Sequence, residues 1–377
     1  TFISRLPGAR RWYNRYLPLM PLALEQLDLS GYDLIISSES GPAKGVIVPP
    51  EATHVCYCHS PMRYIWDRYH EYRSQAGLLT RWMMPLTAHY LRTWDVASAA
   101  RVGTFVANSR FVSCRIQQYY HRQSTVIHPP VDVDALGRQT GEPTGESDDF
   151  YLYVGQLVGY KGVEMAVETF NRLQRRLVVI GEGPLLQKLR SMAGDTVEVM
   201  GWQPDEVVHQ MYRTCRALVF PGVEDFGIVP VEAMASGRPV LALDAGGARE
   251  TVMPGISGML FTEPTPQSLM DCVTDFERSP DFDPEKLRMH AQQFSRGKGH
   301  FMPIEHRASA ELPDADYPLM LTTERSLYHY HTGTMTRKVD GLNKLRAEEL
   351  VEINPADAAA LGVADGETVN VASRRGQ

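Results

Sequence analysis

Two glutamates stand eight positions apart in the segment VEDFGIVPVEAMASGRPV, residues 223–240, with a glycine and a proline between them. A helix is expected to begin near Pro230, because proline is favoured at the first helical position, and to end near Gly237. Glu232 would then lie in the first turn of the helix, and Glu224 on the loop before it. Carboxylates so placed could accept hydrogen bonds from ribose hydroxyls (Glu232) and from hydroxyls of an attached sugar (Glu224).

The loop between the two glutamates is suited to an anion. Gly227 would let the backbone approach a ligand closely, and the free N–H groups of Ile228 and Val229 would point outward from the helix N-terminus. A diphosphate fits such a site. The alternative for any single pair of this spacing is a solvated acid followed by an acid that stabilises a helix dipole. The neighbouring motifs therefore decide between the two readings.

Alternating strand and helix patterns surround this segment and predict parallel sheets covered by helices. Ligands of such sheets bind beyond the carboxyl ends of the strands. A polar stretch interrupts the series, and we expect a first domain over 1–136, a linker over 137–149 and a second domain over 150–297. The expected strands lie within 32–40, 53–59, 102–109, 150–157, 176–184, 197–202, 217–222 and 238–247.

Composition restricts the possible classes of protein. The chain has 377 residues with 43% hydrophobic and 22% charged, which excludes a disordered protein and predicts two or three domains. Five cysteines without a C-x-x-C pair suit a reduced, cytoplasmic protein. There is no run of 18 apolar residues and no leader pattern, so neither a spanning helix nor a signal peptide is expected. No nucleic-acid partner is expected either.

The ordered motifs resemble the family 4 retaining nucleotide-sugar glycosyltransferases, over about residues 1–297. The resemblance implies the GT-B fold, an α/β architecture in which two Rossmann-like domains face a cleft. It is nearest in character to mannosyltransferase-like members that build polysaccharides, so GDP-mannose is the first expectation for the donor, with UDP-sugars open. The matching segments are YCHSPMRYIWD, VANSRFVSCRI, YVGQLVGYKG, VVIGEGPLLQKL, EDFGIVPVEAMASGRP and DAGGARETV.

The resemblance implies roles for individual residues on the donor side. Lys161 would balance the donor diphosphate, and Gln156 stands where the family often has arginine. Glu224 would act at the sugar and Glu232 at the ribose. A structural turn explains the G-x-G pair equally well, and a plain loop explains the later glycine pair. The remaining donor-side candidates are Gly181, Gly183, Phe226, Gly227, Ile228, Val229, Gly246 and Gly247.

On the acceptor side, His59 would stabilise positive charge at the anomeric carbon or hold a sugar hydroxyl, the alternative being a structural histidine. Arg63 and Asp67 would line the acceptor site, although a buried ion pair explains both equally well. No metal is required for this chemistry, since catalysis would rest on positioning and on stabilising the departing diphosphate. A non-catalytic nucleotide-sugar binder is the alternative, because family members begin with a strand and Gly-rich loop that are not present before Thr1.

The segment LLTRWMMPLTAHYLRTW, residues 78–94, mixes apolar and aromatic residues with two arginines. Residues 1–138 also carry 15 Lys and Arg against 10 Asp and Glu. Both features suit a peripheral protein at the inner face of the plasma membrane that uses a lipid-linked or polysaccharide acceptor. A packed helix and a solvated basic face are the plainer alternatives.

The tail resembles part of the molybdopterin-dinucleotide-binding domain of formate dehydrogenases, a double-psi β-barrel, over about 298–377, with one short helix expected in NPADAAALG. The resemblance implies molybdopterin guanine dinucleotide as a cofactor only if the tail is functional, and Glu324 departs from the usual glycine. Since the cluster cysteines and catalytic core of such enzymes are missing, we expect an accidental junction near Ser295. A long sequencing read that showed continuous coding over codons 285–310 would overturn this. The implied contacts are Arg325, His331, Thr332, Thr334 and Thr336.

Overall fold

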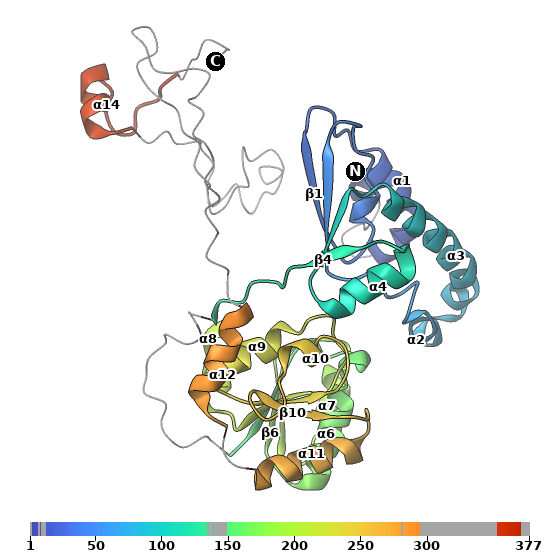
Figure 1. The fold of residues 1–377 in the computed structure, drawn as a ribbon, viewed down its shortest axis with the longest axis vertical. Helices are drawn as coiled ribbons and strands as arrows, with labels where there is room; N and C mark the ends of the chain where they lie inside the picture. The colour runs from blue at the N-terminus through green and yellow to red at the C-terminus, as the bar shows by residue number, and fades with distance from the viewer. Residues whose placement is uncertain are drawn as a thin grey trace. The chain divides into compact units, whose positions relative to one another are not determined.

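The computed structural model describes residues 2–6, 8, 13–133, 136, 149–279, 282–294 and 353–370 (Figure 1). The chain divides into two units, Thr1–Gly299 and His300–Gln377. The first unit holds two parallel sheets, which we call the first lobe (residues 13–133) and the second lobe (residues 149–294).

The first lobe is built on a four-stranded parallel sheet in the order β1-β2-β3-β4. Its core lies between the sheet and two long helices and includes Cys56, Cys58, Phe105 and Ile116. The strands are β1 (Leu34–Glu39), β2 (Thr53–Cys58), β3 (Thr104–Ala107) and β4 (Ser124–Val126), and the helices are α1 (Met20–Glu25), α2 (Tyr69–Gln75), α3 (Leu78–Ala100) and α4 (Arg110–Tyr120).

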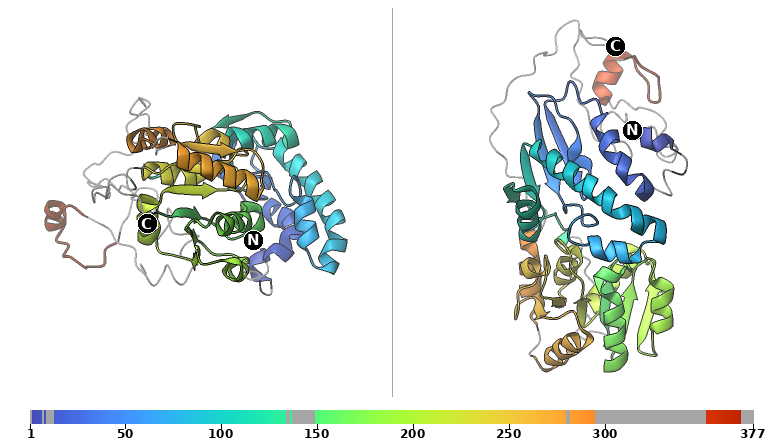
Figure 2. Two further views of the ribbon diagram at one scale, coloured as in Figure 1. Left: turned by 90° about the horizontal axis from the view of Figure 1, so that it is seen from below. Right: turned by 90° about the vertical axis from the view of Figure 1, so that its right-hand side faces the viewer.

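The second lobe is a six-stranded parallel sheet in the order β10-β9-β8-β5-β6-β7. Its strands are β5 (Tyr151–Val154), β6 (Leu177–Ile180), β7 (Val197–Gly201), β8 (Ala217–Phe220), β9 (Val240–Leu243) and β10 (Gly258–Phe261). The central strands read as continuous apolar runs because helices cover both faces, as expected for a doubly wound fold (Figure 2).

The helices of the second lobe form two layers. One core joins the sheet to α8 (Asp205–Thr214), α9 (Ile228–Ala235) and α12 (Pro284–Ala291). The other joins it to α6 (Val163–Leu173), α7 (Leu186–Met192) and α11 (Pro266–Arg278). The short helix α10 (Ala248–Thr251) follows β9. Every strand predicted from the sequence of both lobes is present, and β4 and β10 were not predicted.

A cluster of charged residues is buried inside the first lobe. The Lys44 ammonium, with a fully buried side chain, pairs with Asp95 and lies 3.3 Å from a carboxylate oxygen of Glu39. The Trp66 indole and the Tyr120 hydroxyl both donate hydrogen bonds to the other Asp95 oxygen, at 2.8 and 2.9 Å. Burial alone would lower the pKa of Lys44, but the two carboxylates outweigh it and raise that pKa. We call these five residues the buried ion cluster.

The start of α9 differs from the prediction. The helix begins at Ile228, two residues before Pro230, because Gly227 adopts a left-handed conformation (φ 87°) and makes the turn into the helix. Glu232 therefore lies in the second turn, not the first. The end of the helix is as predicted, since Gly237 is left-handed (φ 78°) and follows the last helical turn.

In the second unit the structure describes one helix, α14 (Pro355–Leu361), where the sequence predicted it. Its Asn354 side chain accepts a hydrogen bond from the Ala356 N–H at 2.9 Å and so caps the helix. The predicted linker residues 137–148 and most strands of the predicted barrel lie outside the described residues. Among the helices that are described, none is both long and apolar enough to cross a membrane.

Candidate functional site

Two neighbouring strands of the second lobe bring Lys161 and Glu224 together. Lys161 closes a short 3-10 turn (Gly159–Lys161) after β5, and Glu224 follows β8, which pairs with β5 in the sheet. The Lys161 Nζ lies 2.7 Å from Oε1 of Glu224, and both side chains are about four-fifths buried, with exposures of 20% and 23%. The predicted cation and the predicted sugar-binding acid are therefore in direct contact at the carboxyl end of the sheet.

Glycines allow the loops around this pair to pack closely. A Cβ on Gly222 would lie 2.5 Å from the Lys161 Cα, and one on Gly247 would lie 2.4 Å from the Phe226 carbonyl oxygen. The Gly247 N–H donates a hydrogen bond to the Glu224 carbonyl at 2.8 Å. The loops after β5, β8 and β9 thus support one another. Gly222 was not singled out from the sequence, although it follows directly on the buried strand and Pro221.

The other predicted glycines hold the loop of Gln156. Gly181 and Gly183 have φ of 143° and 158°, and a Cβ on them would lie 1.9 Å from the Gly155 carbonyl oxygen and 2.4 Å from that of Leu157. Gly246 similarly packs on the Glu224 carbonyl oxygen, at 2.3 Å from its would-be Cβ. Close packing accounts for these glycines without a ligand. The Gln156 side chain itself is exposed.

Helix α9 presents the remaining donor-side candidates. Ile228 and Val229 are its first two residues, so their N–H groups have no partner within the helix. Glu232 accepts a hydrogen bond from the Tyr212 hydroxyl at 2.9 Å, and burial raises its pKa. The tyrosine thus holds Oε2 of the carboxylate.

Phe226 does not turn its ring toward a ligand. Its side chain is 3% exposed, and its ring centroid lies 5.3 Å from that of His128 and 5.6 Å from that of Phe294. Only its backbone can therefore contribute to a binding site. The Phe226 side chain is thus a core residue that fixes the loop after β8.

His59 follows β2 in the first lobe, at the carboxyl end of the sheet, as predicted. The Ser38 hydroxyl lies 2.9 Å from its Nε2, and the Asn108 side-chain amide donates to its carbonyl oxygen at 3.0 Å. Burial lowers the pKa of His59, and the charge of Asp225 opposes that shift only in part. The imidazole is therefore neutral near pH 7, with one ring nitrogen held by Ser38.

Arg63 and Asp67 each form an ion pair, but with different partners. Arg63 pairs with Asp225 of the second lobe, and Asp67 lies 2.6 Å from Nη2 of Arg115. Arg115 also reaches Asp225, at 2.8 Å. Sequence reasoning missed both partners. Asp225 stands inside the EDFG motif, which could have drawn attention to it, whereas nothing in the sequence distinguishes Arg115.

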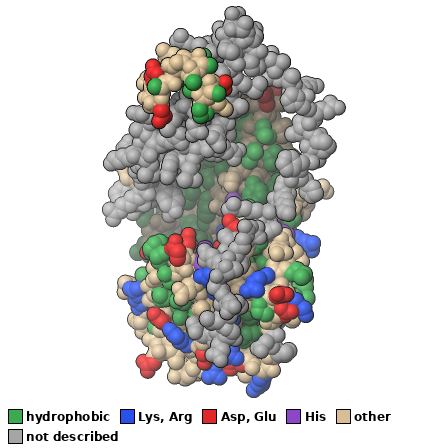
Figure 3. Space-filling view, turned by 90° about the vertical axis from the view of Figure 1, so that its left-hand side faces the viewer, with side chains coloured by type: hydrophobic (Ala, Val, Ile, Leu, Met, Phe, Trp, Pro, Cys, Tyr) green, Lys and Arg blue, Asp and Glu red, His purple; other side chains and the backbone are tan. Residues whose placement is uncertain are grey.

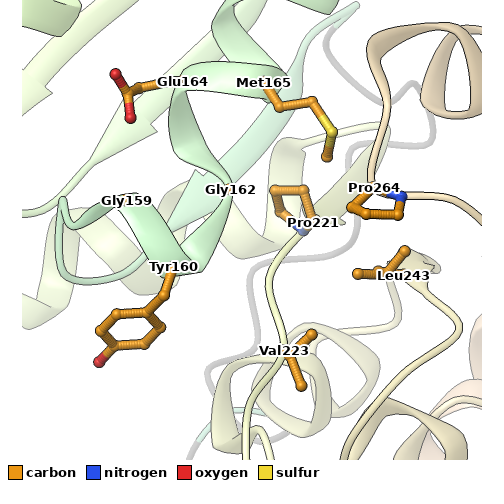
Figure 4. Close-up of a pocket in the computed structure, with 9 residues that line it drawn as sticks. All are labelled: Gly159, Tyr160, Gly162, Glu164, Met165, Pro221, Val223, Leu243 and Pro264. Atoms are coloured by element: carbon orange, nitrogen blue, oxygen red, sulfur yellow. The ribbon is translucent and has the colours of Figure 1, made fainter. Parts of the chain in front are cut away.

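A pocket of about 290 Å³ lies beside the Lys161 loop (Figure 4). Figure 4 shows apolar side chains gathered around it, while the Tyr160 and Glu164 side chains point away. None of the predicted site residues lines it. The lining residues are Gly159, Tyr160, Gly162, Glu164, Met165, Pro221, Val223, Leu243 and Pro264.

No metal centre accompanies the site in the part of the chain that is described, since no group of three or more His, Cys, Asp or Glu side chains is arranged to hold an ion there. The tail residues predicted to contact a molybdopterin lie outside the described residues.

The two parallel sheets and the loops at their carboxyl ends define the GT-B class of fold. A sucrose-phosphate synthase from Thermosynechococcus elongatus has a similar structure, with a TM-score of 0.57 and 19% identity, covering 76% of this chain and 75% of that one. The Anabaena protein HepE in complex with UDP is similar at a TM-score of 0.55 and 19% identity, covering 74% and 78%. At such identity the likeness shows the fold alone.

The sequence comparisons identify the families. Residues 139–296 match the family described as glycosyl transferases group 1, and residues 319–377 match the Molydopterin dinucleotide binding domain. These matches confirm the predicted resemblance to a glycosyltransferase over residues 139–296 and to a molybdopterin-dinucleotide-binding domain over residues 319–377.

The relatives of the two parts are different proteins. An uncharacterised glycosyltransferase of Methanocaldococcus jannaschii is 26% identical over 194 residues, covering 50% of this chain and 53% of that protein. The F420-dependent formate dehydrogenase subunit alpha of the same organism is 48% identical over 91 residues, covering 24% of this chain and 14% of that protein. The chain therefore spans about half of one relative and about one-seventh of the other.

Proposed function

We propose that residues 1–297 transfer a hexose from a nucleotide diphosphate sugar to an acceptor hydroxyl, with retention of anomeric configuration. The observation that carries this proposal is the contact between Lys161 and Glu224 beside the N-terminus of α9. A cation, an acid and free helix N–H groups are the chemistry that a sugar diphosphate needs. Glu232, on the same helix, supplies a carboxylate for the ribose.

Donor binding would exchange partners within the site. Lys161 is neutralised by Glu224 at 2.7 Å in the structure. An incoming diphosphate carries more charge than one carboxylate and would take over the ammonium. Glu224 would then be free to accept hydrogen bonds from the sugar hydroxyls. The pair thus couples recognition of the phosphates to recognition of the sugar.

Catalysis would follow from position and electrostatics. The bond from the anomeric carbon to the diphosphate oxygen breaks, the acceptor oxygen attacks from the same face, and its proton passes to the departing diphosphate. Lys161 and the N–H groups of Ile228 and Val229 would stabilise the charge that develops on the leaving group. Neutral His59 would hold a sugar hydroxyl or face the anomeric carbon.

The donor base and sugar are finer parts of the proposal. GDP-mannose is favoured by the resemblance of the motifs, whereas HepE, which shares the fold, was solved with UDP. The two bases differ in size and hydrogen-bonding pattern, so a direct comparison separates them. Transfer to a polysaccharide or lipid-linked hydroxyl is the proposed acceptor chemistry.

Thermal shift measurements with GDP, UDP, GDP-mannose and UDP-glucose test the donor site. Ligand at 100 times its dissociation constant stabilises the native state by about 2.7 kcal/mol, which a melting curve resolves. We expect a shift with one base that disappears in Glu232→Ala and persists in the control Glu168→Ala, whose side chain lies on the exposed face of α6. A shift that both variants retain would contradict the role of Glu232.

Sugar transfer itself is measured by release of the nucleoside diphosphate in the presence of an acceptor glycoside. Binding of a nucleotide without any transfer would favour the alternative of a non-catalytic binder. The family match of residues 319–377 favours a second function, binding of a molybdopterin dinucleotide by the tail. Pterin fluorescence that copurifies with the full chain would support it, and its absence from protein made in a molybdopterin-producing host would contradict it.

The first half of α3 is the proposed membrane-contact surface. Its exposed apolar side chains form a stripe at helical spacing, Leu78, Leu79, Trp82, Met83, Leu86 and Tyr90, with exposures from 47% to 88%. Residues 68–93 contain four arginines and a single acid, Glu71. Arg81 is exposed beside the stripe, whereas Arg68 and Arg92 donate to backbone carbonyls of the protein. The helix runs along the outside of the first lobe (cyan in the right-hand view of Figure 2).

Charge complementarity makes an anionic lipid surface the proposed occupant of this stripe, because apolar and aromatic residues beside arginines suit the bilayer interface. The face of the second lobe in Figure 3 differs, since its basic and acidic side chains are interspersed. Sedimentation with phosphatidylglycerol vesicles should retain the wild type and lose much of Trp82→Ser/Leu86→Ser. Equal binding to neutral phosphatidylcholine vesicles, or no binding to either, would contradict this surface.

A further inference from the structure

Asp225 joins the two lobes through two arginines. Its Oδ2 pairs with Arg63, and its Oδ1 lies 2.8 Å from Nη1 of Arg115. Both arginines belong to the first lobe, whereas Asp225 lies on the loop after β8. The side chains of Arg63, Arg115 and Asp225 are 17%, 6% and 12% exposed, so the contact is largely removed from water. Asp67 completes the group at Nη2 of Arg115. We call these four residues the Asp225 bridge.

The bridge adjoins both halves of the candidate site. Arg115 and Arg63 also donate hydrogen bonds to the Ser60 hydroxyl, at 2.8 and 3.3 Å. Ser60 is the residue after His59, and Asp225 is the residue after Glu224. One group of ion pairs thus ties together the segment that carries the acceptor-side histidine and the segment that carries the donor-side acid.

Other contacts support the same register between the lobes. Arg68 donates to the Val223 carbonyl oxygen at 3.2 Å. The carboxylate of Glu250 accepts from the Arg110 and Phe111 N–H groups, both at 2.9 Å, at the N-terminus of α4. Val223 precedes Glu224, but of the contacts named here the bridge alone also reaches the residue next to His59, through Ser60.

We infer that Asp225 is a positioning residue that holds the His59–Ser60 segment and the Glu224 loop in register for sugar transfer. Both carboxylate oxygens are engaged by arginines of the first lobe, so the structure places Asp225 in the contact between the lobes. The group of two arginines and two aspartates is also neutral as a whole. Asp225 therefore aligns the residues that meet donor and acceptor, and leaves nucleotide binding to the second lobe. This inference rests on the proposed function.

The kinetic test compares Asp225→Asn with the wild type. The amide is isosteric but cannot balance two guanidinium groups, so the loops should lose their register. We expect kcat to fall by about tenfold or more while the donor KM stays within about threefold. The thermal shift produced by the preferred nucleoside diphosphate should persist. Arg63→Lys, which keeps the charge, should retain more of the wild-type kcat than Asp225→Asn does. The control Asp271→Asn, at an exposed position, should have the wild-type kcat.

A spectroscopic test keeps the inference separate from the proposed function. The imidazole signal of His59, assigned by its absence in His59→Gln, should titrate at lower pH in Asp225→Asn, because Asp225 favours the protonated ring. If the wild type transfers no sugar but Asp225→Asn still lowers the pKa of His59, the proposed function is refuted and the contact between Asp225 and the His59 segment stands. An unchanged His59 titration, or a kcat within about twofold of wild type, would overturn the role of Asp225.

Discussion

Two groups of ion pairs differ in where they lie and what they connect. The buried ion cluster lies inside one lobe, where Lys44 and its two carboxylates have side chains no more than 1% exposed. The Asp225 bridge joins two lobes, and its members are 6% to 35% exposed. Desolvation is nearly complete in the first group and partial in the second. The first therefore fixes the fold of a lobe, whereas the second can be disturbed without unfolding either lobe.

The largest effect is expected for Lys44→Met, which removes the only cation from the buried ion cluster. Two carboxylates then remain in a site without counter-charge, and breaking a buried pair in this way costs about 3–5 kcal/mol of unfolding free energy. Urea unfolding followed by tryptophan fluorescence measures the loss, since Trp66 donates to Asp95. A loss of unfolding free energy below about 1 kcal/mol would show that the two carboxylates do not need Lys44 as a counter-charge.

Lys188→Met is the matched control for that substitution. Lys188 also pairs with a carboxylate, Glu164 at 2.5 Å, but its side chain is 60% exposed. Exposed pairs contribute about 0–1 kcal/mol. The difference between the two lysine variants therefore isolates the effect of burial.

A smaller loss of stability is expected for Asp225→Asn. The substitution leaves two arginines with weakened partners, a cost of about 1–3 kcal/mol, and both can turn toward water more easily than Lys44. Melting curves of Asp225→Asn and Lys44→Met under the same conditions give the ranking. If Asp225→Asn proved the more destabilising of the two, the bridge would be a folding element, and the distinction between the groups would be wrong.

Nucleotide binding should weaken as the pH falls, over a pH range set by the pKa of Glu232. Burial raises its pKa above the usual value of 4.5. In the proposed donor complex the carboxylate would accept hydrogen bonds from ribose hydroxyls, so affinity should fall as the pH drops through the raised pKa. The free protein responds oppositely, because a raised carboxyl pKa gives stability at low pH that is lost as the pH rises.

Calorimetric titration of the preferred nucleoside diphosphate between pH 7 and about pH 5 measures this window. Glu232→Gln should bind more weakly at pH 7 and show a flatter dependence on pH. The same pH dependence in wild type and Glu232→Gln would assign the titration to another group, such as the phosphates.

The fold of both lobes followed from the sequence because strand-length runs alternate with helical periods. The central strands of the second lobe, which are buried on both faces, are unbroken apolar runs. The start of α9 was misplaced because proline at the first helical position is a general preference. The left-handed Gly227 instead begins the helix two residues earlier. Local propensity thus gave the existence of the helix but not its boundary.

The candidate site was predictable only where one motif holds neighbouring residues. Glu224, Gly227 and Glu232 stand on one loop and its helix, and Lys161 belongs to a motif of the adjacent strand. Arg115 meets Asp225 across 110 positions, and Lys44 meets Asp95 across 51. Nothing local marks such pairs, because their partners are set by packing between elements. The partners within these two charged groups therefore could not be predicted from the sequence.

The smallest loss of stability is expected for an ion pair whose two side chains are both largely exposed. Arg172 and Glu168 pair one turn apart on α6, with side chains 56% and 44% exposed. Arg172→Ala should lower the unfolding free energy by about 0.3–0.5 kcal/mol, and added salt should remove most of that difference because water and ions screen the pair. Melting curves at low and at high sodium chloride measure it. A larger loss that persisted in salt would mean that the arginine stem packs on α6, and that charge burial alone does not rank these pairs.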